Sequence, residues 1–191
     1  MNRSKTQKMV GVAMLGAVGF ILMIPVFPII PGFPFMQVDF SEIPILISTY
    51  LFGPLAGVLT AFIRSVLHYI LTGGDLSKLI GDATSFVAAL TFVLPVYYFT
   101  KNRQTKRSLI IGFLISTIFM TAAMSVVNYF VALPLYFKVL NFDVGMPYAK
   151  YVLIGVIPFN LIKGTLVSAV FLMIHAKLLP WLQKKTQVKR S

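Results

Sequence analysis

Long uncharged stretches alternate with short charged segments along this chain. A hydrocarbon core about 30 Å thick needs roughly 20 apolar residues of helix, and most of the stretches reach that length. They predict membrane helices over residues 9–27, 41–52, 55–71, 79–99, 108–134 and 151–177. Gly53 and Pro54 divide the second apolar region, because proline interrupts a helix and glycine permits a sharp turn. The sequence therefore predicts an all-α integral membrane protein with six transmembrane helices in one domain.

The overall composition agrees with a lipid environment. Hydrophobic residues make up 58% of the 191 residues and charged residues only 12%, about half the charged share of a typical soluble domain. The absence of cysteine and the wide separation of the two histidines argue against a metalloenzyme, so we expect neither a metal nor a cofactor. The uncharged stretch from Met9 to Met36 is too long for a signal-peptide core, so we expect a retained first span.

The distribution of charge predicts the topology. Lysine and arginine mark cytoplasmic segments, and they cluster at both ends of the chain and in residues 101–108. Two cytoplasmic termini require an even number of spans, which supports six although the 41–52 helix is short and must be tilted, extended or shielded by its neighbours. The acids then fall at or near the outer face: Asp39, Glu42, Asp75, Asp82 and Asp143. The net charge of +12 favours anchoring to anionic lipid over binding of nucleic acid, since the basic residues lie at membrane boundaries.

The segment between the first two helices, residues 27–44, is rich in proline and aromatic residues. An ordinary connector would be polar, whereas an apolar loop usually folds over a cavity or over the bundle itself. Both roles remain open from the sequence. Asp39, Phe40 and Glu42 lie at the end of this segment and are candidate ligand contacts.

Three polar side chains are expected to converge in the outer half of the bundle. Lys163 follows Asn160 by three residues, so the two share a helix face, about 21 Å beyond the inner boundary at 1.5 Å per residue. Asn128 lies near the outer end of the preceding helix. Each amide could instead bond a neighbouring helix, but a charge inside a membrane usually marks a functional site.

Two further groups have more than one interpretation. Arg64 and His68 lie one turn apart and either line a pathway or anchor the bundle, with Arg64 bonded to Asp82 or to backbone carbonyls; we favour the structural role. Asp82 is then either a ligand contact or an arginine partner.

Ala13, Gly16 and Ala17 are small residues on the first helix, and they serve internal packing or the docking of a partner.

Four motifs carry a resemblance to a known family. The stretches VDFSEIP, FGPLAG, MSVVNYFVALPLY and GVIPFNLIKG resemble the riboflavin-specific substrate-binding subunits of bacterial energy-coupling-factor (ECF) transporters. The resemblance implies a six-helix protein of the bacterial cell membrane that captures extracellular riboflavin. It also implies partnership with a transmembrane coupling subunit, EcfT, and two cytoplasmic ATPases.

The same resemblance implies roles for individual residues. Ala13 and Ala17 match the small-residue motif that docks on the coupling subunit, and Asn128, Asn160 and Lys163 match positions that bond the isoalloxazine ring. Asp82 departs from the family pattern, in which a neutral residue is expected.

The chemistry of a flavin suits these side chains. An isoalloxazine is a flat apolar body with one edge of alternating carbonyl and N–H groups, and asparagine offers both a donor and an acceptor to such an edge. Lys163 would donate to a ring carbonyl or nitrogen, and one lysine without an arginine cluster suits a neutral ligand. The chain has no phosphate-binding loop for ATP, so energy must come from a partner or an ion gradient. The alternatives are an ECF subunit for another vitamin or a stand-alone secondary transporter, which the lack of an inverted repeat disfavours.

Overall fold

The computed structural model describes residues 5–33, 35–102, 105–141 and 144–188, with side chains as far as His175. Asp143, expected at the outer face, lies outside the described residues. The described chain is mostly helical. Its elements are, in order, α1 (Lys5–Met23), β1 (Phe27–Pro28), β2 (Gln37–Val38), α2 (Glu42–Phe52), α3 (Pro54–Leu71), α4 (Leu76–Thr100), α5 (Lys106–Val127), the π-helix η1 (Asn128–Ala132), α6 (Leu133–Leu140), α7 (Tyr148–Tyr151), the π-helix η2 (Val152–Val156) and α8 (Ile157–Val188).

The helices form six consecutive rods in the described part of the chain. One rod joins α5, η1 and α6, and another joins α7, η2 and α8. Five rods are long and apolar enough to cross a membrane, and α2 is the short sixth. The prediction of six helical segments is therefore confirmed, with one addition: β1 and β2 form a two-residue antiparallel pair at the base of the first loop.

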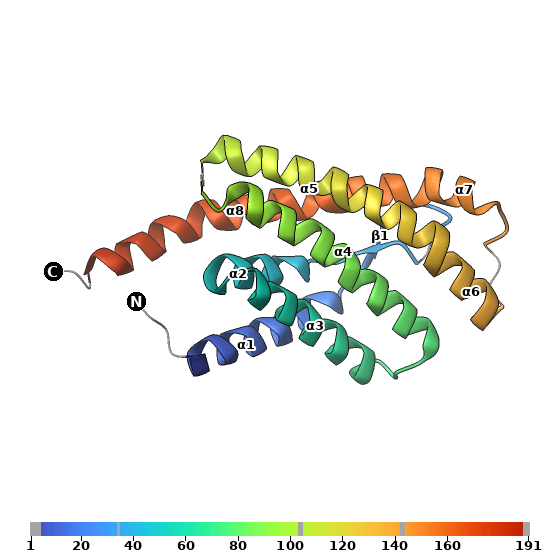
Figure 1. The fold of residues 1–191 in the computed structure, drawn as a ribbon, viewed down its shortest axis with the longest axis horizontal. Helices are drawn as coiled ribbons and strands as arrows, with labels where there is room; N and C mark the ends of the chain where they lie inside the picture. Colours follow the sequence, from blue (N-terminus) through green and yellow to red (C-terminus); the bar gives the residue numbers. More distant parts are fainter. Residues whose placement is uncertain (1–4, 34, 103–104, 142–143, 189–191) are drawn as a thin grey trace.

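The rods lie roughly side by side in two groups (Figure 1). In this view α1, α2 and α3 run along one side, α5 and α8 along the other, and α4 lies between them. The start of α1 and the C-terminal part of α8 point toward the same end of the bundle. This arrangement agrees with an even number of crossings.

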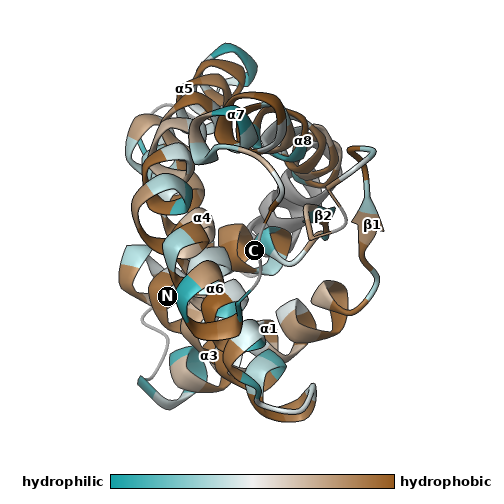
Figure 2. Ribbon diagram, turned by 90° about the vertical axis from the view of Figure 1, so that its right-hand side faces the viewer, coloured by the Kyte–Doolittle hydropathy of each residue, from teal (hydrophilic) through white to brown (hydrophobic). Residues whose placement is uncertain are grey.

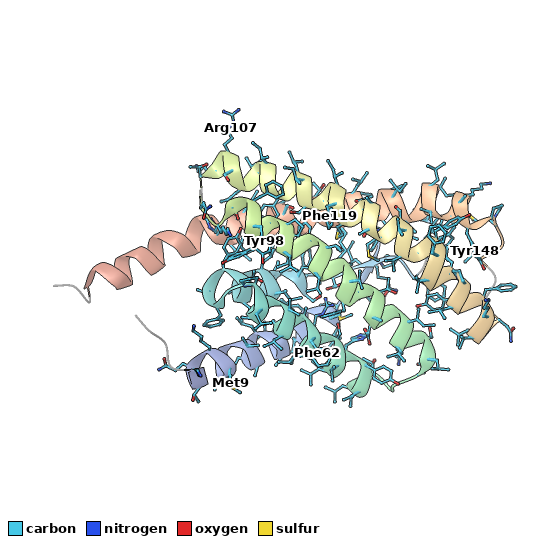
Figure 3. All side chains as sticks on the ribbon, in the orientation of Figure 1. Met9, Phe62, Tyr98, Arg107, Phe119 and Tyr148 are labelled. Carbon is cyan, nitrogen blue, oxygen red and sulfur yellow. The ribbon has the colours of Figure 1, made fainter. Side chains whose placement is uncertain are left out.

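The outward surface of the bundle is apolar, as lipid contact requires. Figure 2, which looks along the bundle, shows hydrophobic residues on every labelled rod. Met9, Phe62 and Phe119, which are labelled in Figure 3, are examples of large apolar side chains that are exposed. The interior combines a hydrophobic core around Phe92 and Val93 with several buried polar side chains.

The short helix α2 is shielded by its neighbours. Most of its residues from Glu42 to Thr49 are buried. Gly57 of α3 lies so close to α2 that an added Cβ would be 1.9 Å from Thr49 Oγ1, which leaves no room for a side chain. Of the three explanations offered for a short second helix, this packing supports shielding. The predicted turn after it is confirmed, since Gly53 has φ 100° and α3 starts at Pro54.

Two rods contain a π-turn directly before a proline, and one of them continues past a proline at which the sequence predicts a helix end. The 108–134 helix was expected to end near Pro134, and instead the rod extends to Leu140. In η1 the N–H of Leu133 donates to the carbonyl of Asn128, and in η2 the N–H of Ile157 donates to the carbonyl of Val152. Each wide turn lies directly before a helix with proline at its second position, where a regular turn would clash with the ring.

The other helix ends differ from the predicted bounds for local reasons. Helix α1 starts earlier than predicted, at Lys5, and ends earlier, at Met23, because Pro25 disfavours the helical conformation in the residue before it. Helix α4 starts at Leu76 because the Asp75 carboxylate caps it, accepting from the Lys78 N–H at 2.8 Å. That hydrogen bond holds the pKa of the Asp75 carboxyl below its usual range.

Candidate functional site

Lys163 lies in a buried cluster of charges. Its Nζ is 2.7 Å from Glu42 Oε1 and 3.1 Å from Asp39 Oδ2, although Asp39 is 124 positions away in the sequence. All three side chains are buried, with Glu42 only 1% exposed. The last residues of the first loop and the first turn of α2 thus supply two carboxylates to an ammonium on α8. Such a contact offsets the large cost of an unpaired charge in lipid.

Arg64 joins the same cluster from α3. Its Nη1 donates to Ser41 Oγ at 2.6 Å, and its Nη2 donates to Ser65 and Ser85 at 3.2 and 3.1 Å. The backbone N–H of Ser41 donates in turn to Asp39 Oδ1 at 2.8 Å. Of the partners considered for Arg64, neither Asp82 nor a backbone carbonyl is bonded to it among the described residues; serine hydroxyls take their place. These hydrogen bonds connect α3 with the end of the first loop and with α4.

Asp82 pairs with His68. The His68 Nδ1 lies 2.7 Å from Asp82 Oδ1, and Asp82 is buried. His68 is one turn beyond Arg64 on α3, which brings its ring to α4 while Arg64 reaches the loop. Within the described residues, Asp82 Oδ2 has no hydrogen-bond partner, so this carboxylate retains a free acceptor.

The two asparagines make the same kind of hydrogen bond, although Asn160 is buried and Asn128 only partly so. The Asn128 amide donates to the Met124 carbonyl, and the Asn160 amide donates to the Val156 carbonyl, each at 2.8 Å. These bonds stay within one helix, so the side-chain oxygens make no hydrogen bond among the described residues. Asn128 opens η1, and Asn160 follows η2 by one turn. The segments η1 and η2 contact each other, so both asparagines lie on adjacent rods.

The first loop folds onto the bundle beside these residues. Phe33 and Met36 are buried, and the Phe33 ring lies 4.9 Å from the Tyr151 ring. Gly155 allows this contact, because a Cβ there would lie 2.4 Å from the Phe33 ring. Phe40 is partly buried and packs against the hydrophobic core. The loop therefore covers this part of the bundle, and its polar end places Asp39 beside Lys163.

A shallow groove of about 390 Å³ lies elsewhere, between the outward faces of the last two rods. It is lined by Ser125, Val126, Tyr129, Phe130, Ala149, Val152, Leu153 and Ile157. Its lining is apolar and includes none of the candidate polar residues. We assign it to the lipid-facing surface rather than to the site.

The small residues of α1 divide between two environments. Ala13 is exposed and Ala17 is partly exposed. Gly16 instead packs inside, where an added Cβ would lie 2.6 Å from the Ile63 side chain. Gly16 therefore belongs to the α1–α3 packing interface, and the expected docking face is reduced to the two alanines.

Sequence reasoning did not identify several residues of the cluster and of its cover. Ser41 and Ser85 accept from Arg64, and Phe33 and Met36 cover η2. Serines give no sequence signal of this kind, whereas the aromatic loop residues were recognisable as a group but not by position.

Comparison with known proteins agrees with this architecture. Residues 7–175 match the family model described as the ECF transporter, substrate-specific component. The chain belongs to this family. The match spans all six rods, so the charged cluster and both asparagines lie inside the matched region.

Individual relatives extend over nearly the whole chain. The riboflavin transporter RibU of Staphylococcus aureus (strain TCH60) is 36% identical over 185 residues, covering 96% of each chain. RibU of Streptococcus thermophilus is 39% identical over 177 residues, covering 92% of this chain and 84% of the relative. The riboflavin transporter FmnP of Bacillus subtilis (strain 168) is 36% identical over 184 residues.

A solved structure also resembles this fold. It is described as the S component of a bacterial ECF transporter, with a TM-score of 0.80 and 36% sequence identity. The superposition covers 94% of this chain and 99% of that one. The six-rod bundle is therefore the fold of a substrate-specific component.

Proposed function

We propose that this protein captures riboflavin at the outer face of a bacterial cell membrane, as the substrate-binding subunit of an ECF-type transporter. The observation that carries the proposal is the buried Lys163 ammonium on the same helix as Asn160, in a chain whose relatives are named riboflavin transporters. ATP hydrolysis would be supplied by the partners, EcfT and two cytoplasmic ATPases.

The polar edge of the flavin would be bound by three side chains. An ammonium has three donors, and Asp39 and Glu42 accept at most two of them, so one remains for a ring carbonyl. The free side-chain oxygens of Asn128 and Asn160 would accept from the ring N–H group. Phe40 would contribute to the apolar wall, and Asp82 Oδ2 would accept from a ribityl hydroxyl.

The charge balance of the cluster favours a neutral ligand. With all four side chains ionised, the two charges of Asp39 and Glu42 balance those of Arg64 and Lys163, so the cluster is neutral before a ligand binds. A phosphate would add an unbalanced negative charge to a buried site, which costs several kcal/mol or requires protonation. We therefore expect riboflavin to bind more tightly than flavin mononucleotide.

The orientation and the docking face are part of the same proposal. Both termini would be cytoplasmic, since basic residues cluster at both ends of the chain. The exposed Ala13 and the partly exposed Ala17 would then contact the coupling subunit, because small residues allow close helix approach in lipid.

The decisive experiment is to purify the full chain in detergent and identify the bound small molecule. We expect a flavin absorbance spectrum, release of riboflavin on denaturation, and quenching of riboflavin fluorescence on titration. Protein that is folded but shows neither bound flavin nor quenching would refute the proposal. Binding of a different vitamin would show that the protein is a substrate-binding subunit for that vitamin instead.

A further inference from the structure

Arg64 is the largest side chain that is almost completely buried in the described part of the chain, and the proposed ligand contacts do not include it. We propose that Arg64 is a positioning residue: it acts through Ser41 and Asp39 to hold the Lys163 ammonium where the ligand is bound. This inference rests on the proposed function. It assigns to α3 a part in ligand binding without direct contact.

A continuous series of hydrogen bonds connects the two cations. Arg64 Nη1 donates to Ser41 Oγ at 2.6 Å, and the Ser41 N–H donates to Asp39 Oδ1 at 2.8 Å. The other oxygen of Asp39 accepts from Lys163 Nζ at 3.1 Å. The series passes from α3 through the end of the first loop to α8, so a change at its first residue can reach the last.

The arginine itself is held in place. Two further hydrogen bonds, to Ser65 and Ser85, fix the guanidinium between α3 and α4. On the α1 side, Gly19 lies against its aliphatic stem, and a Cβ there would be 3.4 Å from Arg64 Cγ. A side chain packed in this way keeps its geometry, which a positioning role requires.

The positive charge of Arg64 also stabilises the two buried carboxylates of the cluster. Without the guanidinium, two buried carboxylates would share one ammonium, and like charges in one site cannot both remain ionised at low cost. One acid would then take up a proton or turn away, and Lys163 would lose a fixed partner. The Lys163–Glu42 pair of this cluster joins α8 directly to α2.

The test is a double-mutant cycle on riboflavin affinity, measured by fluorescence quenching with the purified full chain. Arg64→Met and Ser41→Ala are each made in the wild type and in Lys163→Met. We expect Arg64→Met to weaken binding roughly 10-fold in the wild type, the loss typical of one hydrogen bond to a charged group. In the Lys163→Met background the same change should have less than about a twofold effect, because coupled residues do not add. Arg64→Lys should restore part of the affinity.

The outcomes separate this inference from the proposed function. Equal losses in both backgrounds would show that Arg64 only supports the fold, and no loss in either would show that it is irrelevant to binding; both overturn the inference. If Arg64→Met does not fold, the Ser41→Ala cycle decides alone, because it removes the hydroxyl that accepts from Arg64 and keeps the backbone N–H that donates to Asp39. Wild-type protein that binds no riboflavin would instead refute the proposed function and this inference with it.

Discussion

Replacing Lys163 with methionine separates two contributions of its ammonium. Methionine keeps most of the apolar stem and removes the charge. In the free protein, the ammonium pairs with Asp39 and Glu42, so its loss acts on folding. In the complex, it would also donate to the flavin, so its loss acts on binding as well.

The magnitudes of the two effects differ. Removing one partner of a buried ion pair costs about 3–5 kcal/mol of stability, less if an acid takes up a proton. That cost applies with and without ligand, so it lowers the melting temperature without directly changing affinity. A charge-assisted hydrogen bond to the ligand is worth roughly 1.5–3 kcal/mol, which corresponds to a roughly 10- to 150-fold weaker affinity.

The assay pairs riboflavin titration with thermal unfolding of the same detergent-purified samples. Lys150→Met is the matched control, because Lys150 is exposed at the start of the same rod and makes no ion pair among the described residues. We expect the control to match the wild type in both measurements. A Lys163→Met protein with lower stability but unchanged affinity would refute the ligand role and leave Lys163 as a structural anchor.

Three other predictions test the remaining parts of the proposal. Replacing Ala13 and Ala17 with leucine should abolish uptake and copurification with the coupling subunit while leaving isolated binding unchanged; loss of binding would indicate internal packing. A cysteine introduced at Thr105, in a chain with no native cysteine, should resist an impermeant reagent in intact cells, and labelling there would overturn the topology. Asp82→Asn should weaken riboflavin binding about tenfold or less but leave the affinity for lumichrome, which lacks the ribityl chain, unchanged; an equal loss for both ligands would remove Asp82 from the site.

Hydropathy and charge were sufficient to predict the bundle but not its irregularities. The six segments follow from uncharged stretches, and the Gly53-Pro54 turn follows from backbone chemistry. Pro134 was a reasonable point at which to end a helix, because proline usually breaks one. The rod continues past Pro134 through the π-turn at Asn128–Ala132, and no residue pattern in the sequence marks such a turn.

The candidate site was predictable within a helix but not between helices. Helical spacing places Lys163 and Asn160 on one face, and both are buried as a site requires. Which acid pairs with the lysine depends on contacts between helices, which helical spacing does not specify. In the structure Lys163 pairs with Glu42 and Asp39, and Asp82 pairs with His68.

The buried charges themselves argue for function rather than stability. The chain has only five acids, and of the four that the structure describes, three are buried beside lysine, arginine or histidine side chains. Well-packed apolar residues can replace a buried ion cluster without loss of stability, and often with a gain. A protein surrounded by hydrocarbon has even less need of such a cluster to fold, since its neighbours could pack with methyl groups alone. The cluster around Lys163 is therefore best explained by a ligand that needs fixed donors and acceptors when it enters the bundle.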